Sequence, residues 1–145
     1  MTVRRVATLA LAGALCSYAC GRAGGLVVED AWVRAAPPGV AVQAGYLTLR
    51  NPAPGAATVV GARSDAFGRV EIHASVNRNG MRAMRRIERL EVPAGGRVQL
   101  EPGGRHLMLI EPGRPYREGE RLRIVLILAD GREHGFVAEV RADAP

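Results

Sequence analysis

The stretch Arg69-Val-Glu-Ile-His-Ala-Ser-Val76 alternates between apolar and polar side chains. The apolar residues share one parity: Val70, Ile72, Ala74 and Val76. Successive residues of a strand point to opposite faces, so this period predicts a half-buried β-strand. One face would enter a core, and the other would present polar side chains that include Glu71 and His73.

Short segments of similar character occur along the rest of the chain. Seven more are predicted as strands: residues 27–33, 42–49, 58–62, 97–101, 106–110, 121–128 and 132–140. Turn-forming clusters separate them, among them Asn77-Arg-Asn-Gly80, after which the chain returns from His73, and Asp130-Gly131, which is typical of a tight hairpin. Residues 82–90 have only weak helical spacing, and no segment supports a major helix. The pattern therefore predicts an all-β chain, either a β-sandwich or a β-barrel.

Length and composition restrict the classes of function. A chain of 145 residues with 48% hydrophobic and 23% charged residues is the size of one folded domain, which excludes a multidomain enzyme. All 20 basic residues are Arg, so lysine chemistry is excluded. No carboxylate pair, Ser-His-Asp set or phosphate-binding loop stands out, and we expect no enzymatic activity.

Residues 1–20 have the order of an export signal. Arg4 and Arg5 precede a short apolar run and a small-residue cleavage region, as in a secretory signal peptide. The segment fits two processing routes: ordinary cleavage, or lipidation of Cys20 as in a bacterial lipoprotein. In the lipidated case the chain would be membrane-anchored through Cys20. We expect residues 21–26 to be a short linker and residues 27–141 to be one exported domain.

The net charge of +6 does not indicate a nucleic-acid-binding protein. Residues 21–145 contain 18 Arg and 14 acidic residues, and the difference is only +4. Nucleic-acid recognition favours a basic face with stacking aromatics, but aromatics are 4% of this chain. The cluster Arg82, Arg85, Arg86 and Arg89 is interpreted as a solvated surface.

Methionine and histidine are concentrated between residues 73 and 108. In His106-Leu-Met108 the imidazole and the thioether project to one face, while Leu107 and Leu109 face the core. His73 is presented in the same way, and Met84 follows on the returning segment. Imidazole and thioether are soft ligands that suit Cu(I). Each residue alone is better explained by packing or solvation, so the hypothesis rests on the joint pattern.

The joint pattern is His73, ten residues, Met84, twenty-one residues, and His106-Leu-Met108. With this spacing the sequence resembles the PCu(A)C family of periplasmic copper chaperones. Surrounding segments are similar to that family as well: Glu29-Asp-Ala-Trp-Val-Arg34, Tyr46-Leu-Thr-Leu49, Val70-Glu-Ile-His73, Val92-Pro-Ala-Gly-Gly96 and Leu100-Glu-Pro-Gly-Gly-Arg-His-Leu-Met-Leu109. The resemblance spans roughly residues 27–141.

The resemblance implies a cupredoxin-like β-sandwich in which His73, Met84, His106 and Met108 ligate one Cu(I) per chain. It also implies copper carriage in the periplasm and delivery toward the copper centres of cytochrome c oxidase, alongside a Sco-type thiol protein. The extra methionines that many relatives have after the first His are absent here, and residues 142–145 contain neither His nor Met, so one copper per chain is expected.

Other residues near the pattern are assigned structural roles. Met81 is expected to be a hydrophobic cover, Trp32 a packing residue, and His134 a surface residue. Glu101 and Arg105 are expected to be solvated turn residues. The alternative function is an exported non-metal β-sandwich that binds a protein partner, with its Met and His serving only in packing. Copper content after expression with added copper distinguishes the two.

Overall fold

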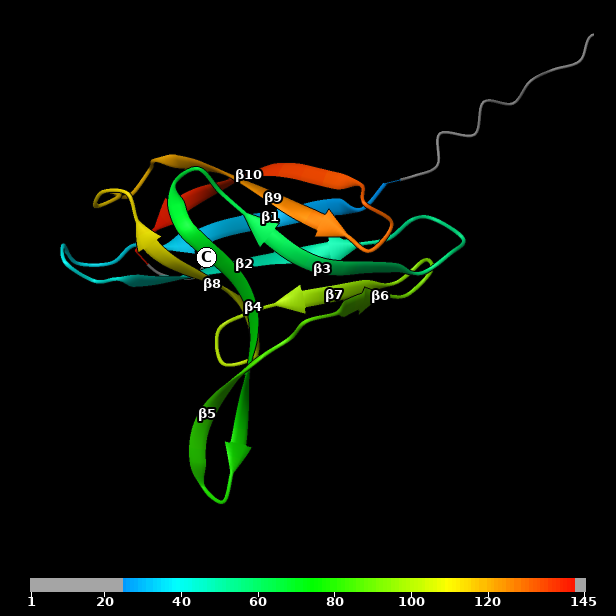
Figure 1. Cartoon of the computed structure of the whole chain (residues 1–145), viewed down its shortest axis with the longest axis horizontal. Helices are drawn as coiled ribbons and strands as arrows, with labels where there is room; N and C mark the ends of the chain where they lie inside the picture. Colours follow the sequence, from blue (N-terminus) through cyan, green and yellow to red (C-terminus); the bar gives the residue numbers. More distant parts are fainter. Residues whose placement is uncertain (1–24, 143–145) are drawn as a thin grey trace, which may run out of the picture.

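A computed structural model describes residues 25–142, and the predicted export segment lies outside this range. The described chain is built from ten β-strands (Figure 1). They are β1 (Val27–Arg34), β2 (Val42–Arg50), β3 (Ala57–Arg63), β4 (Phe67–Arg78), β5 (Met81–Arg86), β6 (Leu90–Val92), β7 (Arg97–Leu100), β8 (Arg105–Pro112), β9 (Arg121–Leu128) and β10 (Glu133–Arg141). The all-β prediction is confirmed. No helix among these residues is long and apolar enough to cross a bilayer.

The strands form a continuous, barrel-like sheet. Starting from β4, the hydrogen-bonded order is β4-β8-β2-β1-β10-β9-β3, and a further pairing joins β3 back to β4. That closing contact has a single register pair, Ala62 with Val70. β5 extends the sheet beyond β4, β6 extends it beyond β3, and β7 pairs with part of β2. Closure leaves few free strand edges.

The core follows the alternation of the sequence. Val70 and Ile72 of β4 are buried, and so are Leu107 and Leu109 of β8, which are 1% and 0% exposed. Gly45 of β2 makes this packing possible, because a Cβ there would lie 3.3 Å from both Leu107 Cβ and Leu109 Cδ1. The side chains of opposite parity on β4 and β8 consequently lie on the outer face of the sheet.

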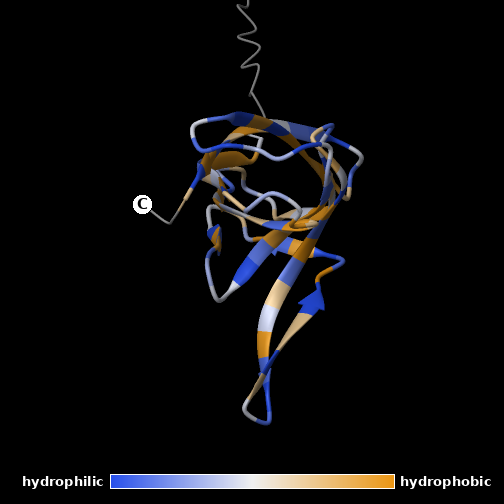
Figure 2. Ribbon diagram, turned by 90° about the vertical axis from the view of Figure 1, so that its left-hand side faces the viewer, coloured by the Kyte–Doolittle hydropathy of each residue, from blue (hydrophilic) through white to orange (hydrophobic). Residues whose placement is uncertain are grey.

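A long hairpin of β4 and β5 projects from the body of the protein (Figures 1 and 2). Its turn is Asn79-Gly80, whose φ angles of 52° and 80° are the positive values that a two-residue type I′ turn requires. The register Arg78–Met81 and Ser75–Met84 follows from this turn. The hairpin is therefore positioned by local turn chemistry.

The sequence did not predict β5 and β6 as strands. All six residues of β5 are exposed, so it has no apolar and polar alternation to detect. Residues 82–90, which have weak helical spacing in the sequence, lie in β5, in the segment that follows it and at the first residue of β6. Ala74 and Val76, which share the parity of the core residues, are only half-buried because they lie where β4 leaves the barrel.

Candidate metal centre

Two histidines lie side by side on the outer face of adjacent strands. His73 of β4 is in register with His106 of β8, and the centroids of the two rings are 6.1 Å apart. His106 is 6% exposed and the His73 side chain 13% exposed. The strand pairing thus places two imidazoles close together in a sheltered position, although they are 33 residues apart in the chain.

Glu71 determines which nitrogen of His73 is free. The His73 Nε2 lies 2.9 Å from Glu71 Oε2. This hydrogen bond, followed by the charges of Arg86 and Arg69, lowers the pKa of the Glu71 carboxyl, which therefore stays ionised and acts as the acceptor. Nε2 must then be the protonated nitrogen. The His73 Nδ1 is buried and has no hydrogen-bond partner within the described part of the chain.

His106 has the opposite arrangement. Its Nδ1 donates to the Gly104 carbonyl at 3.2 Å, because a carbonyl oxygen can only accept. In the neutral ring this leaves the lone pair on Nε2. The two rings thus offer one free nitrogen each, Nδ1 of His73 and Nε2 of His106. A histidine whose other nitrogen is held by a carboxylate or carbonyl is the usual form of a metal-binding histidine.

Met108 lies on the same outer face of β8 as His106. Its neighbours in register are Glu71 of β4 and Ala44 of β2, and the side chain is half-buried. Met108 therefore lies next to Glu71, the residue that holds the ring of His73. Leu107, between the two, anchors the strand in the core as the alternation predicted.

Met84 lies on the projecting hairpin. It is in register with Ser75, and it lines a pocket of about 240 Å³ together with His106, Tyr46 and Ser75. The Met84 side chain is 65% exposed. β4 separates β5 from β8, a span of about 10 Å at ordinary strand spacing. Met84 thus shares a pocket with His106, and it is the most accessible of the four candidate ligands.

An aromatic pair borders this pocket. Tyr46 packs against Trp32 of β1 with ring centroids 4.5 Å apart and ring planes tilted by 39°, and both residues are buried. Tyr46 lines the pocket, whereas Trp32 packs behind it against a separate surface that includes Pro102. The packing role predicted for Trp32 is confirmed.

The remaining sequence candidates lie outside the histidine pair. Met81 is at the end of the hairpin and 71% exposed, so the expected covering role has no packing to support it. His134 is half-buried on β10, in register with Leu126. Glu101 and Arg105 are exposed beside the turn that contains Gly104, as expected.

Two residues that help to form the candidate site were not identified from the sequence. Glu71 has the same parity as His73 two residues later, and this shared face was the signal that could have identified it. Tyr46 carried no such signal, because its place beside His106 depends on the pairing of β2 with β8.

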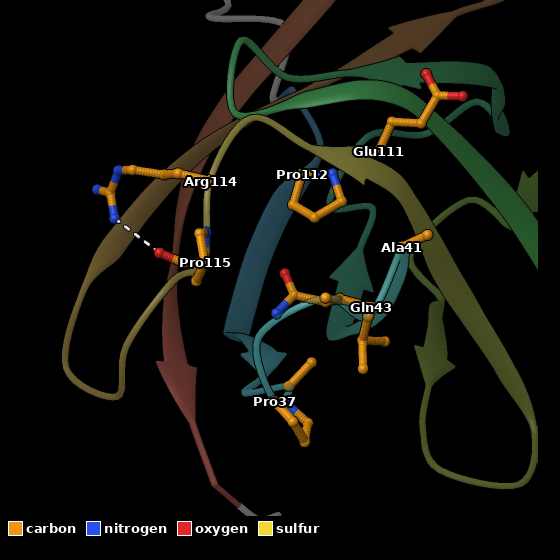
Figure 3. A pocket seen from close by; sticks show the side chains of 10 residues that line it. Pro37, Ala41, Gln43, Glu111, Pro112, Arg114 and Pro115 are labelled. Carbon is orange, nitrogen blue, oxygen red and sulfur yellow. Dashed lines mark hydrogen bonds between the residues drawn. The ribbon is translucent and has the colours of Figure 1, made fainter.

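A second pocket, of about 400 Å³, lies at the other end of β2 and β8 (Figure 3). Its walls include Pro37, Pro112 and Pro115, and the buried side chain of Gln43 extends between them. The Gln43 Oε1 accepts no hydrogen bond from the described residues. None of the four candidate ligands lines this pocket.

Comparison with known proteins identifies the family and the fold. A family model described as "Putative lipoprotein LpqE-like" matches residues 26–140, which is nearly all of the described chain. This chain belongs to the LpqE-like family. A curated relative, "Putative lipoprotein Lxx21020" of Leifsonia xyli subsp. xyli, is 35% identical over 111 residues. That match covers 76% of this chain and 66% of the relative, less than two thirds of the relative's length.

Solved structures similar to this LpqE-like protein include PCuAC domains and the protein DR1885. The copper-bound PCuAC domain of PmoF2 superposes with a TM-score of 0.69 at 24% identity, covering 83% of this chain and 96% of that domain. CuI-DR1885 of Deinococcus radiodurans superposes with a TM-score of 0.68 at 31% identity, covering 86% and 84%. The fold is therefore that of PCuAC domains.

Proposed function

We propose that this protein binds one Cu(I) through His73, Met84, His106 and Met108 and carries it to another protein. The observation that carries the proposal is the in-register histidine pair, in which each ring has one nitrogen held by the protein and one left free. Two similar structures contain copper, and the DR1885 structure is of the Cu(I) form.

The donor set favours Cu(I) over other metals. Imidazole and thioether are soft ligands, and zinc and Cu(II) prefer sets richer in thiolate, imidazole or carboxylate. The only Cys residues of the chain are Cys16 and Cys20, before the domain. A set of two imidazoles and two thioethers would stabilise the reduced ion and disfavour redox cycling, so the role is carriage without catalysis.

The exposure of the four ligands suggests an order for copper release. His73 and His106 are sheltered in the sheet, whereas Met84 is open to solvent on the hairpin. A ligand of an approaching protein can replace the Met84 sulfur first, while the histidines still hold the ion. The copper would then pass through a shared intermediate without entering solution.

The location and destination form a further part of the proposal. The LpqE-like relatives are named as lipoproteins, which supports export and, through Cys20, a lipid anchor in the periplasm. We propose cytochrome c oxidase copper centres as the destination and a Sco-type protein as co-worker, both on the family resemblance. We also propose that the sheet corresponds to a cupredoxin-like sandwich, since its closing contact between β3 and β4 is a single register pair.

Competition against a Cu(I) chelator under reducing conditions tests the ligand set. The protein should bind one Cu(I), and Met84→Ala and Met108→Ala should each lower the affinity by about tenfold or more, a loss of about 1.4 kcal/mol per factor of ten. Met81→Ala is the matched control, because Met81 lies on the same strand and is more exposed. Its affinity should equal that of the unsubstituted protein.

Two results would overturn the proposal. If Met84→Ala and Met108→Ala both bind Cu(I) as tightly as the parent protein, the thioethers are not ligands. If the parent protein takes up no copper, the alternative function as a non-metal binding module is correct.

A further inference from the structure

Arginines surround the free edge of the sheet beside the candidate copper site. β5 is the end strand in the sheet order, and every one of its residues is exposed. Arg86 and Arg82 are in register with His73 and Asn77, on the face of β5 that carries Met84. Arg85 has the opposite parity and points to the reverse face. A molecule that reaches Met84 from the strand edge therefore meets guanidinium groups on both faces.

A groove of about 720 Å³ lies on the reverse face, where the hairpin joins the barrel. The small side chain of Ala74 lies at its centre, because Ala74 is in register with Arg85 on one side and Arg105 on the other. The lining contains four arginines and one acid: Arg85, Arg86, Arg89, Arg105 and Glu88.

Most of these charges have no ion-pair partner in the described part of the chain. Among residues 25–142, Arg85, Arg89 and Arg105 form no salt bridge, and Arg86 pairs with Glu71 at 3.3 Å. Elsewhere some exposed arginines, such as Arg63 and Arg114, are paired with glutamates, and others are not. What distinguishes Arg85, Arg89 and Arg105 is that they line one groove together. Uncompensated guanidiniums gathered in one concave surface attract carboxylates and can bind them in a bidentate way.

Protection of a free edge against aggregation explains only part of the cluster. Charged residues on an edge strand prevent pairing with other chains, and this accounts for Arg82 and Arg86. It does not account for Arg105, which lies on the internal strand β8, or for Arg89, which follows β5. The arginines therefore surround the groove as well as the free edge of β5.

We propose that β5 and this groove are the docking surface for an acidic segment of the protein that accepts copper. The inference rests on the proposed function, because it identifies the chemistry of the recipient at the same site. Carboxylates of the recipient would pair with Arg85, Arg89 and Arg105 and bring its own metal ligands to the exposed Met84. Electrostatic steering of this kind accelerates association and weakens as salt increases.

Two synthetic peptides test the proposal. Both carry the same Met and His copper ligands, and one is flanked by glutamates while the other is flanked by glutamines. At low salt the copper-loaded protein should transfer Cu(I) to the glutamate peptide about tenfold faster than to the glutamine peptide. The double variant Arg85→Glu/Arg89→Glu should remove this difference and keep the copper stoichiometry, since neither residue is a candidate ligand.

The matched control is Arg97→Glu/Arg121→Glu, which changes the net charge equally at two exposed arginines without ion pairs in the described chain. It should retain the preference for the glutamate peptide. Equal rates with both peptides in the parent protein, or equal losses in both double variants, would overturn the docking surface while copper binding persists. Absence of copper binding in the parent protein would instead contradict the proposed function.

Discussion

Glu71 and Gly104 each hold one nitrogen of a candidate copper ligand. Glu71 accepts from Nε2 of His73, and the Gly104 carbonyl accepts from Nδ1 of His106. Each contact orients its ring before any metal binds, which reduces the entropy lost on binding. The site is therefore largely prepared on the histidine side and open on the side of Met84.

We expect Glu71→Gln to weaken Cu(I) binding by about tenfold, the lower range for loss of a group that holds a metal-binding histidine. The neutral amide would bond less strongly to the ring and would leave Arg69 and Arg86 without their shared partner. Chelator competition measures the change. Glu91→Gln, at an exposed position of β6, is the control and should have no effect. Unchanged affinity in Glu71→Gln would contradict the assignment of Nδ1 as the free nitrogen of His73.

For single residues, the sequence predicted on which face of its strand a side chain lies. It did not predict which residue of the adjacent strand lies beside it. Alternation placed Glu71 and His73 on one face of a strand, and His106 and Met108 on one face of another. It could not predict that His73 and His106 lie in register, because pairing between distant strands depends on the whole topology. The hydrogen bonds that select the free nitrogens follow from that pairing.

The β4–β5 hairpin is the element that positions Met84. Its turn needs positive φ at both Asn79 and Gly80, and the turn sets the register that places Met84 opposite Ser75. The dipeptide is visible in the sequence, so the hairpin was predictable. The strand character of β5 was not, because Met81–Arg86 is exposed on both faces and has no period.

We expect Gly80→Val to lower Cu(I) affinity by about tenfold. A β-branched residue at a φ of 80° is strained by about 1–2 kcal/mol, and the turn would relieve this strain by shifting the register of Met84. Gly131→Val is the matched control, since Gly131 has a φ of 83° and lies in the β9–β10 hairpin, which carries none of the candidate ligands. Both variants should lose similar stability in denaturant unfolding, but only Gly80→Val should lose copper affinity. Equal copper affinities would show that the hairpin does not position a ligand.

On the scale of the whole molecule, the site lies on strands that are paired on both sides. β4 and β8, which carry three of the four candidate ligands, are both interior strands of the closed path. Their inner faces are held by buried residues such as Ile72, Leu107 and Leu109. The strand pattern predicted the all-β class and left sandwich and barrel open, whereas the family resemblance implied a cupredoxin-like sandwich. Local patterns could not predict the β3–β4 contact that closes the sheet, because it is a single pairing between distant residues.

Copper should stabilise the whole domain. Because the ligands come from β4, β5 and β8, only the folded chain brings them together, and binding must favour the folded state. Free Cu(I) buffered at about a hundred times its dissociation constant adds about 2.7 kcal/mol, or roughly 10 °C in Tm for a domain of this size. Thermal unfolding with and without buffered Cu(I) measures this shift. A double variant Met84→Ala/Met108→Ala that still shows the full shift would place the copper elsewhere.

The most direct test of the central claim is X-ray absorption spectroscopy of the protein loaded with one equivalent of Cu(I). The account predicts a reduced copper edge and a first shell of two nitrogen and two sulfur scatterers, from His73, His106, Met84 and Met108. Met84→Ala and Met108→Ala should each remove one sulfur, and Met81→Ala should remove none. A first shell of nitrogen and oxygen alone, or a sulfur contribution that survives the loss of both Met84 and Met108, would contradict the proposed site.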